Sequence, residues 1–151
     1  MTVKNEILIR MMQPGDVEDI FEIEKACFSR PWSRESLAAV VTDEKACYVV
    51  AVDKKTHHVV GYVGSYVILD EADINQVAVS EKYRRCGIAA ALMQDFIQKL
   101  EERNIKAITL EVRAGNVAAI ALYKKMGFEM EGIRKNFYEA PVEDACIMWR
   151  R

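Results

Sequence analysis

The sequence is poor in the residue patterns that mark a metal-bound or disulfide-linked protein. Its four cysteines are scattered without a Cys-x-x-Cys pair, and its two histidines, His57 and His58, are adjacent in a polar stretch. Zinc sites and disulfide frameworks need closely spaced cysteines or histidines, so we expect neither, and no metal. The isolated cysteines are instead typical of small buried residues in a reducing compartment.

Excess charge and long apolar runs are also missing. The chain has 21 Lys and Arg against 23 Asp and Glu, a formal net charge of -2, which gives no overall field for a nucleic acid or an anionic membrane. No stretch approaches the roughly 18 apolar residues of a membrane span, and Lys4 and Glu6 interrupt any apolar run near the start. We therefore expect a cytoplasmic protein without nucleic-acid or membrane partners, in which any phosphate binding is local.

What is present is the composition of an ordinary globular domain. Of the 151 residues, 51% are hydrophobic and 29% are charged, and no repeat, low-complexity run or Pro/Ser-rich linker divides them. A chain of this length buries about two thirds of its unfolded surface, which is enough for one core. We expect a single domain over residues 1–151.

Hydrophobic periodicity predicts a mixed order of strands and helices. Strands are expected at residues 7–10, 48–52, 59–63, 72–79, 107–112, 128–133 and 145–149, and helices at 16–27, after Ser33, at 87–103 and at 116–126. This order favours an α/β (α+β) fold with a mixed central sheet of about seven strands flanked by about four helices. Ligands of such folds bind near strand ends, where loops and helix N-termini meet.

The first chemically suggestive segment is a strand, a turn and a helix start. The strand Val77-Ala78-Val79 leads to a turn in which Gly87 and Ala89 are small enough for close approach of a ligand. The unpaired N–H groups of the first helical turn and the helix dipole can hold a pyrophosphate, and Arg84 and Arg85 add positive charge. The alternative is a helix start with solvated arginines. A nucleotide P-loop is excluded, because no G-x-x-x-x-G-K-S/T occurs.

This turn and a second pattern downstream resemble one known family. The run Arg84-Arg85-Cys86-Gly87-Ile88-Ala89 fits the acetyl-CoA signature Arg/Gln-x-x-Gly-x-Gly/Ala of the GCN5-related N-acetyltransferases (GNAT). The stretch from Leu110 to Phe128, with Asn116 and Tyr123 at the family's spacings, resembles the second half of that pattern, and the element order agrees over the whole chain. The resemblance implies the GNAT fold and an acetyl-CoA-dependent N-acetyltransferase.

The resemblance also implies how acetyl-CoA binds. The backbone of Val77 and Val79 pairs with the pantetheine arm as an added strand, and residues 85–90 hold the pyrophosphate. Asn116 caps the following helix, binds the pantetheine amide, or does both. The implied acetyl-CoA-binding residues are Val77, Ala78, Val79, Arg84, Arg85, Cys86, Gly87, Ile88, Ala89, Ala90, Asn116 and Tyr123.

The turn departs from the family pattern at two positions. Cys86 stands where the most similar family members usually carry Arg or Lys, and Ala89 replaces the second Gly. Neither change removes a backbone donor. The loss of one positive charge is expected to weaken cofactor binding slightly.

Acetyl transfer needs a base, because an α-amine with a pKa of about 7.7 to 8.0 is mostly protonated at pH 7 and an ammonium has no lone pair. Glu111 shares one strand face with Ala107 and Thr109, from which it projects toward the strand-end cleft. There it can take the proton directly or through water. The alternative is a structural ion pair with Arg113 on the same face; the resemblance favours Glu111 as the base.

The leaving coenzyme A thiolate needs a proton, and Tyr123 is the candidate acid. On pattern alone a Tyr at this helical position is more often a core aromatic, but it occupies the family's general-acid position. We expect direct transfer in a ternary complex, held together by proximity. A covalent route through Cys86 or Cys146 is not favoured, because neither has a histidine base in its motif.

Two segments predict the acceptor. Residues 28–32 and 137–138 correspond in position to the two loops that flank the acceptor in N-terminal acetyltransferases, which makes Trp32, Phe137 and Tyr138 the substrate-binding candidates. Within the family these segments are similar to the bacterial enzymes that acetylate the N-terminal alanine of a small ribosomal subunit protein. The resemblance therefore implies a protein N-terminus as acceptor and a ribosomal protein as partner.

Three alternatives stay open from the sequence. Trp32 and Phe137 can simply cover the ends of the core. The acceptor can be a small-molecule amine instead of a peptide. The protein can also be a non-catalytic acetyl-CoA sensor, although binding alone needs neither Glu111 nor Tyr123.

Overall fold

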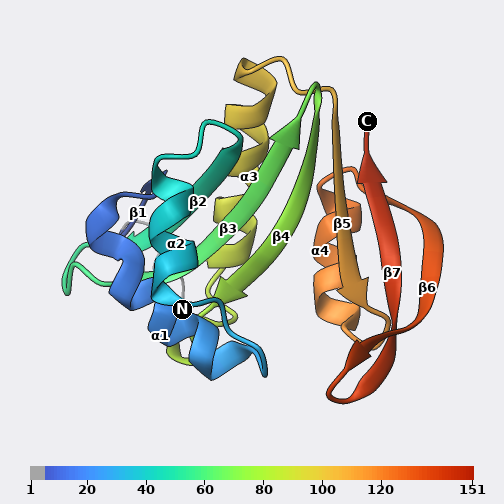
Figure 1. Cartoon of the computed structure of the whole chain (residues 1–151), viewed down its shortest axis with the longest axis horizontal. Coiled ribbons are helices and arrows are strands. Elements are labelled where there is room, and N and C mark those ends of the chain that lie inside the picture. Colours follow the sequence, from blue (N-terminus) through green and yellow to red (C-terminus); the bar gives the residue numbers. More distant parts are fainter. Residues whose placement is uncertain (1–5) are drawn as a thin grey trace.

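A seven-stranded mixed sheet runs through the molecule (Figure 1). The computed structural model describes residues 6–151, so Lys4 lies outside the described residues. The strands are β1 (Ile7–Met11), β2 (Ala46–Asp53), β3 (Val59–Ile68), β4 (Glu71–Val79), β5 (Ala107–Arg113), β6 (Glu129–Glu139) and β7 (Val142–Arg150), in the spatial order β1-β2-β3-β4-β5-β7-β6. The helices are α1 (Val17–Cys27), α2 (Arg34–Val41), α3 (Ile88–Glu102) and α4 (Val117–Lys125). The predicted α/β order is confirmed.

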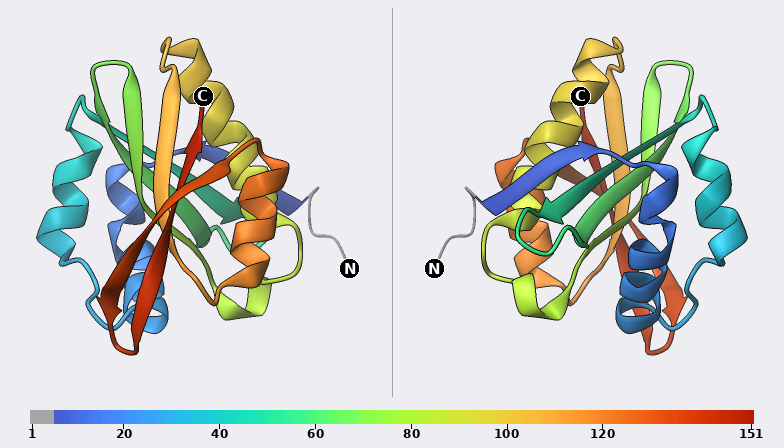
Figure 2. Two further views of the ribbon diagram at one scale, coloured as in Figure 1. Left: turned by 90° about the vertical axis from the view of Figure 1, so that its right-hand side faces the viewer. Right: turned by 90° about the vertical axis from the view of Figure 1, so that its left-hand side faces the viewer.

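The helices cover the two faces of the sheet separately. Helices α1 and α2 pack on one face and α3 and α4 on the other (Figure 2). Each face has its own apolar cluster, one built around Ile20 and Tyr62 and the other around Leu92 and Phe96. No helix between Glu6 and Arg151 has the length and apolar character that crossing a membrane requires.

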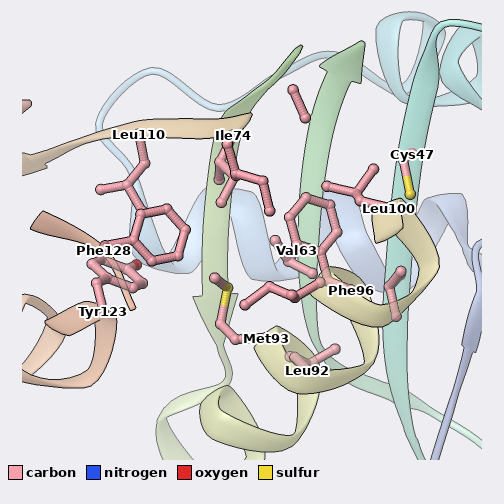
Figure 3. Close-up of a cluster of buried hydrophobic side chains, with 14 of the residues drawn as sticks. Cys47, Val63, Ile74, Leu92, Met93, Phe96, Leu100, Leu110, Tyr123 and Phe128 are labelled. Carbon is pink, nitrogen blue, oxygen red and sulfur yellow. The ribbon is translucent and has the colours of Figure 1, made fainter. Parts of the chain in front are cut away.

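The larger cluster joins α3 to the sheet and to the helix that follows β5. Figure 3 shows Leu92, Met93 and Phe96 of α3 against Val63 of β3, with the ring of Phe128 beside them. These side chains are almost fully buried, and burying each one stabilises the fold by about 1.5–3 kcal/mol. This cluster fixes α3, and with it the turn before α3, against the sheet.

Local sequence signals explain where the helices begin. The Ser33 hydroxyl accepts from the N–H of Ser36 at 3.1 Å and caps α2, and the Asn116 side chain accepts from the N–H of Ala119 at 3.2 Å and caps α4. These are preferred N-cap residues because their oxygens satisfy a free helical donor. The predicted capping role of Asn116 is therefore realised.

Strands β4 and β5 separate soon after they meet. They pair in parallel only at Glu71–Asp73 and Ala107–Thr109, whereas β4 continues its antiparallel pairing with β3 as far as Val79. Figure 1 shows the two strands diverging, with α4 beside β5. Among residues 6–151, no strand pairs with this edge of β4 beyond Asp73, in the region where the sequence predicts the cofactor. 

The β6–β7 hairpin is longer than predicted. Phe137 and Tyr138 were expected in a loop, but they belong to β6, which pairs with β7 out to Glu139 and Val142. The register shifts between Arg134 and Tyr138, and Asn136 has a φ of 54°, so this part of the strand is bulged. Its polar side chains hid the strand, because an antiparallel edge can be solvated while its backbone stays paired.

Gly64 is predicted to be indispensable for packing. An added Cβ would overlap the ring of Tyr48, which is buried, stacked on Tyr62 at 6.3 Å and bonded to Asn75 at 3.3 Å. Gly64→Ala is expected to lower the free energy of unfolding by about 1–3 kcal/mol in a denaturant titration. Gly15→Ala, where a Cβ meets no atom within 4 Å, is the control and should leave stability nearly unchanged; equal losses in both variants would contradict the packing explanation.

Candidate acetyl-transfer site

The free edge of β4 presents backbone groups to the gap. The N–H of Ser80 donates to the carbonyl of Val60 on β3 at 2.7 Å. Because backbone groups alternate in direction along a strand, those of Val79 and Val77 face away from β3. An extended ligand can therefore pair with β4 as an added strand.

Two adjoining hollows lie along this edge. The first, of about 250 Å³, is lined by Val77, Ala78, Val79, Ala89, Asn116, Ala118, Ala119, Leu122 and Tyr123. The second, of about 220 Å³, is lined by Val79, Tyr83, Arg84, Arg85, Gly87, Ile88, Ala89, Ala90 and Leu122. Since Val79, Ala89 and Leu122 line both, the hollows form one groove from α4 to the N-terminus of α3. All but one of the sequence-predicted cofactor residues lie in this groove.

The N-terminus of α3 opens into the second hollow. Gly87 precedes the helix with a φ of 80° and meets no atom within 4 Å on its Cβ side. The first helical bond runs from Ala91 to the carbonyl of Gly87 at 3.1 Å, so the N–H groups of Ile88, Ala89 and Ala90 have no acceptor within the helix. Together with the helix dipole, these donors suit an anionic group such as a pyrophosphate.

The two arginines and the cysteine of the turn differ in placement. The Arg84 guanidinium is turned back, with Nε donating to the Val79 carbonyl at 3.1 Å and Nη2 to the Cys27 sulfur at 3.4 Å. Arg85 adopts a φ of 62°. The thiol of Cys86 points to the carbonyl of Arg84 at 3.5 Å and lines neither hollow, so among the predicted cofactor residues in the described chain Cys86 is the one outside the groove.

Tyr123 belongs both to the core and to the groove. Its ring packs on Phe128 with 5.9 Å between ring centroids, and it lines the first hollow. Burial raises the pKa of Tyr123 to about 12, well above the roughly 8.5 of a free thiol. The phenol therefore stays protonated at neutral pH.

The structural alternative predicted an ion pair between Glu111 and Arg113. The structure does not contain this pair. Arg113 binds Glu143 at 3.2 Å. The nearest cation to Glu111 is Arg134 of β6, with 3.3 Å between Nε and Oε2. That oxygen is buried and accepts no hydrogen bond from any residue in the range 6–151, which leaves it free for an external donor.

Tyr138 interacts electrostatically with the candidate base and with the candidate acid. The Arg113 guanidinium is 4.3 Å from its ring centroid. Burial raises the pKa of Tyr138, and the charge of Glu111 adds to this effect; Tyr138 in turn contributes to the raised pKa of Tyr123. Tyr138 is therefore within electrostatic reach of both Glu111 and Tyr123.

The segment that carries Trp32 is held by a buried carboxylate. Glu24 of α1 is 0% exposed; it accepts from the backbone N–H of Trp32 at 2.9 Å and from the hydroxyl of Tyr62. Arg30 forms an ion pair with Glu139 of the β6–β7 hairpin. The two predicted acceptor segments are thus brought together, while Trp32 keeps partial contact with the core.

Sequence reasoning missed several residues of this site. Glu24 sits at helical spacing from Ile20 on the buried face of α1, a signal that was available. Ala119 and Leu122 were part of the family pattern but had no role assigned. Arg134 belongs to the segment that resembles the family but had no role assigned, because its contact with Glu111 depends on how β6 and β7 pair.

Comparison with known proteins gives the family. The acetyltransferase (GNAT) family matches residues 17–128, well over half of the 151 residues. The chain is also 34% identical over 142 residues to the ribosomal protein bS18-alanine N-acetyltransferase of Escherichia coli strain K12, covering 93% of this chain and 94% of that protein. The chain therefore belongs to the GNAT acetyltransferase family, and it is an acetyl-CoA-dependent N-acetyltransferase.

Solved structures agree with this assignment. The crystal structure of the Escherichia coli ribosomal-protein-S18-alanine N-acetyltransferase matches with a TM-score of 0.86 and 33% identity, covering 95% of this chain and 92% of that one. Arabidopsis thaliana NAA60 in complex with acetyl-CoA has the same fold, with a TM-score of 0.85 at 24% identity over 95% of this chain and 98% of that one. Within the family, the chain is thus similar to the enzymes that act on the alanine of bS18.

Proposed function

We propose that the protein transfers the acetyl group of acetyl-CoA to the α-amine of the N-terminal alanine of ribosomal protein bS18. The observation that carries this proposal is the groove beside β4 with Tyr123 in its wall, together with the unsatisfied buried oxygen of Glu111 on β5. Similarity to bS18-alanine N-acetyltransferases over most of the chain supports the choice of acceptor. The proposed setting is a single domain over residues 1–151 acting in the cytoplasm.

The groove residues divide the binding of acetyl-CoA between them. The backbone groups of Val77 and Val79, which face away from β3, fit the amides of an extended pantetheine arm. The free N–H groups at the start of α3, beside Gly87 and Arg85, fit the pyrophosphate. Acetyl-CoA supplies the activated acetyl thioester when bound.

Glu111 and Tyr123 have separate proton roles in this proposal. The carboxylate of Glu111 accepts a proton from the acceptor ammonium, directly or through water, so that the amine can attack. The Tyr123 hydroxyl donates a hydrogen bond to the departing sulfur, and the thiolate takes up the second proton, which the nitrogen loses as the amide forms. No covalent step on the protein is needed, since Cys146 is 4% exposed and Cys86 lies outside the groove.

Tyr123→Phe is expected to slow turnover without disturbing the fold. The ring and its contact with Phe128 remain, while one hydrogen bond to a charged sulfur is lost, which corresponds to a fall in kcat of about 10- to 100-fold. Because the pKa of Tyr123 is about 12, wild-type activity should show no loss from ionisation of this residue up to about pH 10. Steady-state kinetics at several pH values measure the fall in kcat and the pH dependence of the wild type. Tyr66→Phe on β3 is the control. Unchanged kcat would remove Tyr123 from the mechanism.

A panel of acceptors tests the function itself. Purified protein is incubated with acetyl-CoA and, separately, the N-terminal peptide of bS18, the same peptide with a blocked α-amine, other Ala- and Ser-starting peptides, and simple amines. Mass spectrometry then locates the acetyl group. Acetylation of the free bS18 α-amine supports the proposal; acetylation of small amines alone, or acetyl-CoA binding without any product, contradicts it.

A further inference from the structure

Arg134 reaches the candidate base from the edge of the sheet. On β6, Arg134 lies opposite Ala145 of β7 and Gly132 lies opposite Ile147, which in turn is opposite Glu111 of β5. Paired residues point to the same face of a sheet. The small side chain of Ala145 and the absence of one at Gly132 leave the arginine a path over β7.

The contact between Arg134 and Glu111 is an incomplete ion pair. Arg134 Nε lies 3.3 Å from Glu111 Oε2, yet no hydrogen bond to this buried oxygen forms within residues 6–151. The Arg134 side chain is 58% exposed, and its guanidinium is 5.7 Å from the ring centroid of Phe137. The Arg134 side chain is therefore held beside Glu111 mainly by charge, and it also contacts solvent and the ring of Phe137.

A second carboxylate shares the same arginine. Asp73 pairs with Thr109 at the last rung between β4 and β5, so it points to the same face as Glu111, two residues further along β5. Burial raises the pKa of Asp73, and the charge of Arg134 partly offsets this. On this face, Arg113 is neutralised by Glu143. Two carboxylates on this face and one arginine whose charge acts on both leave a net negative charge, which favours one more cation.

The acceptor amine is such a cation. An N-terminal α-amine with a pKa of about 7.7 to 8.0 arrives mostly as an ammonium at pH 7. It needs a carboxylate oxygen with free hydrogen-bonding capacity, and Oε2 of Glu111 is one. The guanidinium of Arg134 already lies beside that oxygen, so it competes with the ammonium.

We propose that Arg134 is a positioning residue that takes the place of the acceptor ammonium beside Glu111 in the free enzyme and is displaced toward Phe137 when the acceptor binds. This rests on the proposed function, because it takes Glu111 as the base. Arg134 keeps the Glu111 carboxylate in place before binding and weakens the hold on the ammonium afterwards. The exchange therefore lowers the affinity for an acceptor ammonium and leaves the affinity for an uncharged analogue unchanged.

The test compares two ligands that differ only in the amine. The bS18 N-terminal peptide and its analogue with propionyl in place of the alanine are titrated calorimetrically into protein saturated with coenzyme A, so that no turnover occurs. Arg134→Gln is expected to bind the amine peptide about 5-fold more tightly and the analogue with unchanged affinity. Arg134→Lys, which keeps the charge, should bind both peptides like the wild type. Arg151→Gln, which breaks the exposed pair with Glu131, is the matched control.

Two results would overturn the proposal. Unchanged or weaker binding of the amine peptide by Arg134→Gln means that the arginine does not compete with the ammonium, and weaker binding of both peptides means that it supports the hairpin or contacts the peptide chain. An error in the proposed acceptor can be distinguished from an error in the role of Arg134, because the wild type then binds neither peptide. In that case the amine identified by the acceptor panel, with its deaminated analogue, replaces the peptides, and the same 5-fold difference is required.

Discussion

Glu111→Gln is expected to lower kcat about 1000-fold, within the range of a lost general base. The amide keeps the shape of the side chain but cannot take a proton from the acceptor ammonium. Binding of acetyl-CoA should change less than about 2-fold, because Glu111 lines neither hollow of the groove. Saturating steady-state kinetics and calorimetric titration with acetyl-CoA measure the two quantities.

The pH dependence of kcat in the Glu111→Gln enzyme provides a second test of Glu111 as the base. Above about pH 8 the α-amine in solution is increasingly neutral, so the deficit of the Glu111→Gln enzyme should shrink as pH rises. Glu131→Gln on β6, whose carboxylate pairs with Arg151 at the surface, is the control and should keep wild-type kcat. A Glu111→Gln enzyme within 10-fold of the wild type at pH 7 would mean that another group is the base.

Ala119→Trp is expected to reduce acetyl-CoA affinity at least 100-fold. Ala119 faces β4 across the first hollow, and an indole there fills the space in which the pantetheine arm would pair with Val77 and Val79. Losing several backbone hydrogen bonds of about 1 kcal/mol each, together with apolar contact, accounts for 2.7 kcal/mol or more, which is about 100-fold. Calorimetry or fluorescence titration measures the loss.

The same helix offers a matched control for this substitution. Ala121 is exposed on α4, so Ala121→Trp adds the same ring without entering the groove and should bind acetyl-CoA like the wild type. Circular dichroism of both variants checks that the helix is intact. Wild-type affinity in a folded Ala119→Trp protein would place the cosubstrate elsewhere.

Much of the architecture follows from local sequence signals. Alternation and helical spacing predicted every strand and helix in order, because apolar residues on each element must face one of the two clusters. The caps at Ser33 and Asn116 were equally local. The anion-binding end of the groove could be anticipated from the turn at Gly87. The helix begins directly after this glycine, so the free N–H groups of its first turn lie at a defined place.

What the sequence did not predict depends on contacts between distant segments. The length of β6 was missed because its second half has polar side chains that do not look like a strand. Its backbone hydrogen bonds are nevertheless formed with β7. The alternative to a catalytic Glu111 was an ion pair with Arg113 on the same strand face, whereas strand register places Arg134 beside Glu111. The raised pKa of Tyr123 depends on burial by residues from several elements, which spacing alone does not show.

The short junction between β4 and β5 has a consequence for the lifetime of the protein. Three residue pairs, from Glu71 with Ala107 to Asp73 with Thr109, connect the two halves of the sheet. In the proposed binding mode the cosubstrate lies in the remaining gap, so its binding free energy adds to the free energy of unfolding, by about 2.7 kcal/mol at a concentration 100 times Kd. A cell short of acetyl-CoA then holds a larger unfolded fraction of this enzyme, and its proteases remove more of it. In the proposed binding mode, the supply of acetyl-CoA therefore affects the stability of the protein as well as its rate.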